Sequence, residues 1–259
     1  MDLIYVREAR VASTRSALSL APGEVVIGGG TWLYSEEQPA DVTGVVDLMG
    51  MGWEPVTRSD DTLVIAATCT VETLRALPDS PLFQQCADSL LASWKIQRIA
   101  TVGGNIALAL PAGPMTALAV ALDATLVLWT AESERRVPAA EFVTGVRATI
   151  LEPGEILRAI EIPLASLHRT AFRRISLSPL GRTGTLVTGR TDTTGTTVFS
   201  VTGGTARPHR LAFDAPPAPA EVATAVDSID DWHLDAHGTP DWRRAMSLVF
   251  AEEIRAELS

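Results

Sequence analysis

Apolar residues in the first half of the chain recur at two spacings, one typical of strands and the other of helices. Short β-branched runs predict strands at residues 24–27, 45–48 and 63–67. Helices are expected at residues 10–19 and 82–93, and another begins after Thr70, whose hydroxyl can cap its first turn. Such alternation is typical of α/β and α+β folds.

The longest apolar stretch, residues 106–129, is nominally long enough to cross a bilayer. It is interrupted by Pro111, Gly113, Pro114 and Asp123. We therefore predict a loop at residues 109–113, a buried helix at 115–122 and a core strand at 125–129 in place of a membrane span.

The amino-acid composition changes near residue 164, where Arg, Thr and Gly become frequent. Residues 154–163 predict a turn and then an edge strand that ends at Pro163. Further strands are predicted at residues 171–177, 184–190 and 196–202, with a hairpin turn at Thr193-Thr194-Gly195. Because 259 residues exceed the usual length of one domain, we predict two domains, residues 1–164 and 165–259.

The chain ends in a Pro/Ala segment at residues 215–220 and a helix expected at residues 242–258. The residues of this helix with core spacing are Ala245, Leu248, Val249 and Ile254.

The net charge of −10 disfavours nucleic acid and anionic membranes as partners. Cys69 and Cys86 are the only cysteines and have no neighbouring histidine ligands, which argues against a disulfide scaffold, a metal site or an iron–sulfur cluster within this chain. The charged and polar start of the chain is unlike a signal peptide, so we expect a cytoplasmic protein.

Two glycine-rich segments are the strongest candidates for a binding site. Gly28-Gly29-Gly30-Thr31 follows a strand, where glycines let backbone N–H groups converge on an anion. Leu33 stands where the Rossmann fingerprint needs a third glycine, which excludes that motif. Thr101-Val102-Gly103-Gly104-Asn105 offers a second cluster of backbone donors. The alternative is that both segments only allow close packing of helices on a sheet.

The run ATVGGNIALALPAGPMTALAVALDA, from Ala100 to Ala124, has GGGTWL before it and PGEILRAIEIP after it. Together with Val201-Thr202-Gly203-Gly204 and the late segment HGTPDWRRAMSLVF, it resembles the FAD-binding medium subunit of molybdenum hydroxylases. This is the family of the flavin subunits of carbon monoxide dehydrogenase and xanthine dehydrogenase. The resemblance implies an α+β fold: a two-part FAD-binding domain of the PCMH/CO dehydrogenase flavoprotein type, then a smaller α+β C-terminal domain with an antiparallel sheet and helices.

The resemblance also implies which residues surround the cofactor. Residues near the FAD pyrophosphate would be Val26, Ile27, Gly28, Gly29, Gly30, Thr31, Trp32, Leu33, Thr101, Val102, Gly103, Gly104 and Asn105. Leu91 and Leu157 would lie beside the flavin ring, although both could equally be core leucines.

Three departures from the family pattern affect the expected site. Pro114 replaces an acidic residue that could bind the ribityl chain or a ribose. Gln97-Arg98 replaces Arg-Asn, and the family's lysine near the flavin appears as Arg173 or Arg174, for which a solvated strand face is the alternative. No histidine lies within the first 167 residues, so FAD is expected to bind non-covalently.

The function implied by the resemblance is electron transfer by an FAD-dependent oxidoreductase subunit. It implies two partners, a molybdenum-binding large subunit and a 2Fe-2S small subunit, which would carry the molybdenum cofactor and the iron–sulfur clusters. No hydrolytic triad or P-loop is visible, and no catalytic residue is assigned. The alternatives are a stand-alone flavin-dependent oxidase or biosynthetic enzyme, and a scaffold subunit that has lost its flavin.

Overall fold

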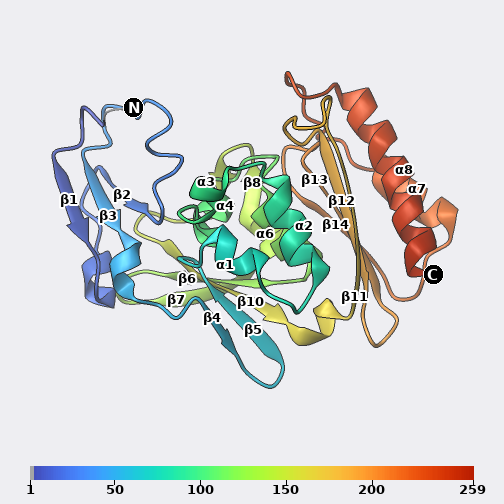
Figure 1. The fold of residues 1–259 in the computed structure, drawn as a ribbon, viewed down its shortest axis with the longest axis horizontal. Coiled ribbons are helices and arrows are strands. Elements are labelled where there is room, and N and C mark those ends of the chain that lie inside the picture. The colour runs from blue at the N-terminus through green and yellow to red at the C-terminus, as the bar shows by residue number, and fades with distance from the viewer. Residues whose placement is uncertain (1–2) are drawn as a thin grey trace.

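The computed structural model describes residues 3–259 and begins with a small parallel sheet. Its strands are β1 (Glu8–Val11), β2 (Glu24–Ile27) and β3 (Gly44–Asp47), in the order β1-β3-β2 (Figure 1). The helix predicted at residues 10–19 is wrong, because β1 pairs with β3 and only the 3-10 helix η1 (Arg15–Leu18) follows. Three serines in this segment favour local turns over a continuous helix.

A second sheet of five antiparallel strands forms the floor of the central part. Its order is β4 (Val56–Arg58), β5 (Thr62–Ala66), β10 (Ile156–Pro163), β6 (Thr125–Trp129) and β7 (Glu134–Pro138). The prediction of an edge strand at residues 154–163 is wrong, since β10 pairs with β5 on one side and β6 on the other. Pro163 is tolerated because it is the last residue of β10.

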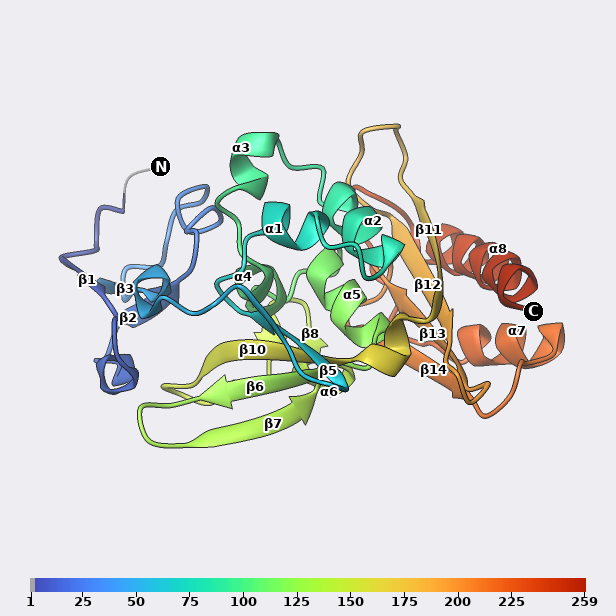
Figure 2. The ribbon, with the colours of Figure 1, turned by 60° about the horizontal axis from the view of Figure 1, so that its bottom comes forward.

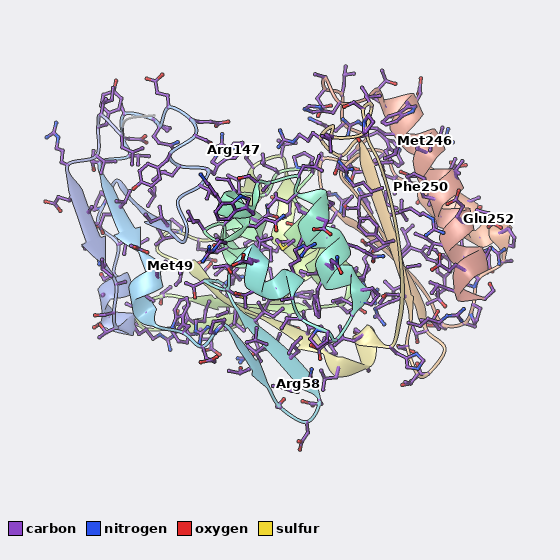
Figure 3. All side chains as sticks on the ribbon, viewed as in Figure 1. Met49, Arg58, Arg147, Met246, Phe250 and Glu252 are labelled. Carbon is purple, nitrogen blue, oxygen red and sulfur yellow. The ribbon has the colours of Figure 1, made fainter. Side chains whose placement is uncertain are left out.

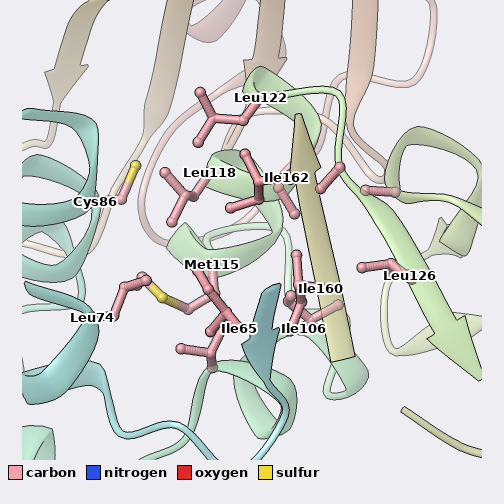
Figure 4. Close-up of a cluster of buried hydrophobic side chains, with 14 of the residues drawn as sticks. Ile65, Leu74, Cys86, Ile106, Met115, Leu118, Leu122, Leu126, Ile160 and Ile162 are labelled. Atoms are coloured by element: carbon pink, nitrogen blue, oxygen red, sulfur yellow. The ribbon is translucent and has the colours of Figure 1, made fainter. Parts of the chain in front are cut away.

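Helices cover one face of this sheet, and Figure 2 shows them above the strands. They are α1 (Val71–Arg75), α2 (Pro81–Ser89), α3 (Trp94–Gln97), α4 (Val102–Ala107), α5 (Pro114–Ala121) and α6 (Ala139–Phe142). Side chains from sheet and helices form one core, which includes Ile65, Leu74, Ile106, Leu118 and Ile160 (Figure 4). The hydroxyl of Thr70 accepts a hydrogen bond from Thr73 N, which confirms the predicted cap of α1.

The helix predicted at residues 82–93 is shorter than expected. It ends at Ser89, because Leu91 adopts a left-handed conformation with φ of +54°. The long apolar stretch was predicted to hold a buried helix and then a core strand. This is confirmed, since α5 and β6 lie within it on either side of a short turn. Within residues 3–259, no helix is both long enough and apolar enough to cross a membrane.

The second half forms a four-stranded antiparallel sheet with two helices on its outer face. The strands, in sheet order, are β11 (Arg169–Ile175), β12 (Thr185–Thr191), β13 (Thr197–Thr202) and β14 (His209–Phe213). The helices are α7 (Pro219–Asp227), which was not predicted, and α8 (Pro240–Leu258). The predicted turn at residues 193–195 is confirmed, with Gly195 at φ of +91°.

The buried face of α8 agrees with the predicted one at Ile254, which is buried, and at Leu248, which packs against the same core, but it differs elsewhere. Ala245 and Val249 are exposed, whereas the buried residues are Arg243, Ser247, Phe250, Ala251, Ile254 and Leu258. Arg243 has no exposed surface, and its guanidinium donates to the carbonyl oxygens of Gly184 and Gly203 and to Asp235. A charged residue is therefore fully buried in the first turn of α8, although hydropathy alone would place it at the surface.

The two halves meet at α5, all of whose residues are buried. A helix that is apolar all round needs cover on every side, and α5 packs between the central helices and strands β12 and β13. Arg190 donates to Ala121 O at 3.0 Å, and both Arg190 and Arg210 donate to the carboxylate of Asp123. Burial alone would raise the pKa of Asp123, but the hydrogen bonds and charges of these arginines hold it below its ordinary value.

Candidate cofactor cleft

A cleft of about 790 Å³ lies between the small parallel sheet, the central helices and the β11–β12 loop. Its volume is within the range of roughly 300–1,000 Å³ that small-molecule and cofactor sites occupy. All of the predicted cofactor contacts line it except Val102, Pro114, Arg173 and Arg174. The chain fold therefore brings both glycine segments to one cleft.

The first glycine segment leaves the carboxyl end of β2 and turns at Gly30, which has φ of +64°. Its internal hydrogen bonds are Tyr34 N to Gly30 O, at 3.0 Å, and Ser35 N to Trp32 O, at 2.9 Å. Among residues 3–259, no acceptor is found for the six consecutive backbone amides of residues 28–33. Partly buried amides normally have partners, so this run is suited to an anionic ligand.

The second glycine segment differs, because its amides already have protein partners. Val102 N donates to Cys69 O, Gly103 N to Ala67 O and Gly104 N to Thr101 Oγ1, at 2.9, 2.9 and 3.1 Å. The prediction that this segment supplies a second set of available backbone donors is therefore wrong. Gly103 instead lets α4 approach the end of β5, since a Cβ there would overlap Ala67.

Close packing joins the two segments. A Cβ on Gly28 would lie 2.6 Å from Thr101 Oγ1, and one on Gly29 would overlap Ile99 O. The carboxamide of Asn105 accepts from Met115 N at 3.0 Å, which ties α4 to the start of α5. The second segment thus packs against the first and holds its amides in position.

Leu91 and Leu157 both line the cleft, but in different ways. Leu157 is almost fully buried on β10 and also belongs to the central core. Leu91 is 40% exposed in a left-handed conformation that is costly for a leucine. Leu91, which is next to the bend between α2 and α3, therefore places an exposed apolar side chain at the cleft.

The four predicted contacts outside the cleft have other neighbours. Val102 is buried in the core, and Pro114 is the first residue of α5. Arg173 forms ion pairs with Glu253 and Glu257 of α8, on the outer face of the four-stranded sheet. Arg174 points to the opposite face, since successive strand residues alternate, and its Nε donates to Thr183 Oγ1 at 2.7 Å.

Several lining residues were not predicted from the sequence. They are chiefly Gln38, Arg147, Leu180 and Arg182, which reach the cleft from three different loops. Gln38 donates to Leu33 O at 3.0 Å and so fixes the loop after the first glycine segment. Trp32, a predicted contact, lines the cleft beside them.

The two cysteines have no chemical part in the cleft. Both are buried, and burial raises the pKa of the Cys69 thiol to about 12 and that of Cys86 further. Thiols with raised pKa values are poor nucleophiles.

Residues 1–165 match the family model described as the FAD binding domain in molybdopterin dehydrogenase. The chain belongs to this family. The predicted resemblance is therefore confirmed, and FAD is the cofactor of the family. The structure provides a cleft of suitable size and a run of unpaired amides that fit a dinucleotide.

Relatives in this family include subunits of dehydrogenases. The chain is 30% identical over 89 residues to the glyceraldehyde dehydrogenase medium chain of Sulfolobus acidocaldarius, covering 34% of this chain and 32% of that one. It is 31% identical over 153 residues to the carbon monoxide dehydrogenase medium chain of Afipia carboxidovorans, covering 56% and 50%. The matched regions thus span half or less of these relatives.

The whole fold also matches solved structures. Reconstituted CO dehydrogenase from Oligotropha carboxidovorans gives a TM-score of 0.84 at 22% identity, over 96% of this chain and 97% of that one. Quinoline 2-oxidoreductase from Pseudomonas putida 86 gives 0.80 at 20% identity, over 97% and 96%. These likenesses confirm the predicted α+β fold class.

Proposed function

We propose that this chain is an FAD-binding electron-transfer subunit of a molybdenum hydroxylase-type dehydrogenase. The observation that carries the proposal is the run of residues 28–33, which lines a cleft of dinucleotide size and whose backbone amides have no acceptor among residues 3–259. Membership of a family named for FAD binding in molybdopterin dehydrogenases supports the same cofactor.

The residues of the chain would bind and orient the cofactor. Amides of residues 28–33 would donate to the pyrophosphate, while Thr101 and Asn105 would hold the opposite wall. Leu91 and Leu157 would contact the flavin ring and exclude water from it. Bound FAD supplies the capacity to accept and release electrons. Residues 1–164 would form the FAD-binding domain, and residues 165–259 would complete the cleft through the β11–β12 loop.

Two partner chains are part of the proposal. A molybdenum-binding large subunit would oxidise the substrate, and a 2Fe-2S small subunit would pass electrons to FAD here for transfer to an external acceptor. The names of two relatives as medium chains support a place in such an assembly.

The test begins with an absorption spectrum of the purified chain from about 300 to 600 nm, before and after reconstitution with FAD, followed by denaturation to release the flavin. Flavin bands and released FAD are expected. Correctly folded protein that stays colourless after reconstitution would overturn the proposal and favour a scaffold subunit.

The electron-transfer role needs a second measurement. The natively expressed protein should co-purify with two other chains, and the complex should contain iron and molybdenum. A lone flavoprotein that oxidises a substrate without partners would instead establish a stand-alone oxidase.

A further inference from the structure

The charge of the cleft is opposite to that of the molecule as a whole. The chain carries a net charge of −10, yet among the described residues that line the cleft the only ones with a formal charge are Arg147 and Arg182. No carboxylate lines the cleft within residues 3–259. Apolar walls of low polarisability strengthen the field of such charges, so the cleft attracts an anion.

Arg147 comes from the short hairpin of β8 (Val143–Gly145) and β9 (Ala148–Thr149). It has φ of +56°, and its amide donates to Ala109 O at 2.8 Å, so its backbone is fixed beside the start of the 109–113 loop. Its guanidinium lies 4.0 Å from a carboxylate oxygen of Glu36, and both side chains are about half exposed. Figure 3 shows Arg147 between the small parallel sheet and the central helices. An exposed ion pair at this distance is weak, which leaves Arg147 able to bind a ligand.

Arg182 comes from the β11–β12 loop of the C-terminal half. Arg174 supports this loop, since its guanidinium donates to Thr183 Oγ1 and to Gly181 O on either side of Arg182. Arg182 itself is exposed and has no ion pair among residues 3–259. Leu180 of the same loop is 86% exposed although it lines the cleft. The loop is therefore held in place while its cleft-facing side chains lack protein partners.

We propose that Arg147 and Arg182 form an anion subsite in the same cleft as the amide run, and that it binds a negatively charged part of the cofactor. The inference rests on the proposed function and adds to it, because it makes the C-terminal half contribute directly to cofactor binding. Two parts of bound FAD are anionic: its pyrophosphate, and its isoalloxazine ring after reduction. Both have the chemistry that a guanidinium recognises.

The test uses the full chain and the variants Arg147→Gln, Arg182→Gln and the double variant. Arg7→Gln is the matched control, since Arg7 is exposed, lies outside the cleft and loses the same charge. Binding of FAD and of riboflavin is measured by flavin fluorescence at about 20 mM and about 300 mM salt, and the reduction potential of the bound flavin is measured for each variant.

If the arginines contact the pyrophosphate, each single variant should bind FAD about tenfold more weakly than wild type, mainly at low salt. Riboflavin, which has no pyrophosphate, should bind all variants equally. A contact to the reduced ring predicts a lower reduction potential in the variants, with equal affinity for oxidised FAD. If wild type and control bind FAD and the variants match them in affinity and potential, the anion subsite is overturned and the proposed function stands. If the wild type binds no flavin, the proposed function and the subsite fall together.

Discussion

The α carbon of Gly29 lies so close to the carbonyl oxygen of Ile99 that no side chain fits at position 29. This contact joins the segment of unpaired amides to the segment that precedes α4. The position of the amides in the cleft thus depends on the absence of a Cβ.

The substitution Gly29→Ala should displace the first glycine segment from residues 99–101. We expect FAD binding to weaken by at least about tenfold, because the amides can no longer converge on one anion. Fluorescence titration with FAD measures the effect. The control is Gly145→Ala, whose added Cβ would make only an ordinary contact at 3.8 Å and should not alter affinity. Unchanged FAD affinity in Gly29→Ala would contradict this role for the segment.

The substitution Leu91→Gly should weaken flavin binding while leaving the stability of the fold nearly unchanged. Glycine relieves the left-handed backbone at φ of +54°, which offsets the loss of a partly exposed side chain, so the free energy of unfolding should stay within about 1 kcal/mol of wild type. Flavin affinity should fall because the cleft loses an apolar contact. Urea unfolding and flavin titration give the two quantities. Ala109→Gly is the control, since Ala109 also has positive φ but does not line the cleft and should leave affinity unchanged.

The substitution Arg243→Met should destabilise the C-terminal half by about 3–5 kcal/mol, because it leaves Asp235 and the carbonyl groups of three glycines without their partner. Arg244→Met is the neighbouring control. Its guanidinium pairs with Asp227 at the surface, so a change of no more than about 1 kcal/mol is expected. Chemical denaturation at neutral pH compares the two. Equal effects would show that the buried network adds nothing.

Acid should weaken the small parallel sheet through Glu24. The hydrogen bond from Arg10, together with the amide of Ala21, lowers the pKa of Glu24 from its ordinary 4.5 to about 2. The folded state therefore binds this proton less readily than the unfolded state. Its stabilising contribution is complete above pH 4.5 and is lost as the pH falls toward 2.

The variant Glu24→Gln tests this dependence. It should be less stable than wild type at neutral pH by about 1–2 kcal/mol, a figure reduced for the partly exposed Arg10, and the two should converge in acid. Denaturation curves across the pH range measure the difference. Glu37→Gln, at an exposed site, should follow wild type. A constant gap between Glu24→Gln and wild type down to pH 2 would contradict the assignment.

Local patterns predicted much of the fold. The β-branched runs became β2, β3 and β5, the end of the long apolar stretch became β6, and Thr70 caps α1 as its position indicated. Errors arose where distant residues decide the outcome. Residues 8–11 form a strand only because β3 offers a partner, and Pro163 signalled an edge although β10 lies in the centre of its sheet.

The site was predictable to the same extent. The first glycine segment has a local signature, so its place in the cleft followed from the sequence. The second has a similar signature, but its amides are used by Cys69 and Ala67, which lie thirty or more residues earlier in the chain. Arg147 and Arg182 have no motif, and only the packing of the two halves brings them to the same cleft. In α8, Ile254 was correctly predicted to be in the core, but Arg243 was missed because hydropathy does not register an arginine whose hydrogen bonds are satisfied.

The position of α5 has a consequence for fragments of this chain. Every residue of α5 is covered, partly by strands β12 and β13. A fragment ending near residue 164 would expose one side of this apolar helix to water and would leave Asp123 without Arg190 and Arg210. It should aggregate or need detergent, despite containing the whole region that matches the FAD family model. The two halves can be told apart in sequence, but they cannot be exchanged as modules.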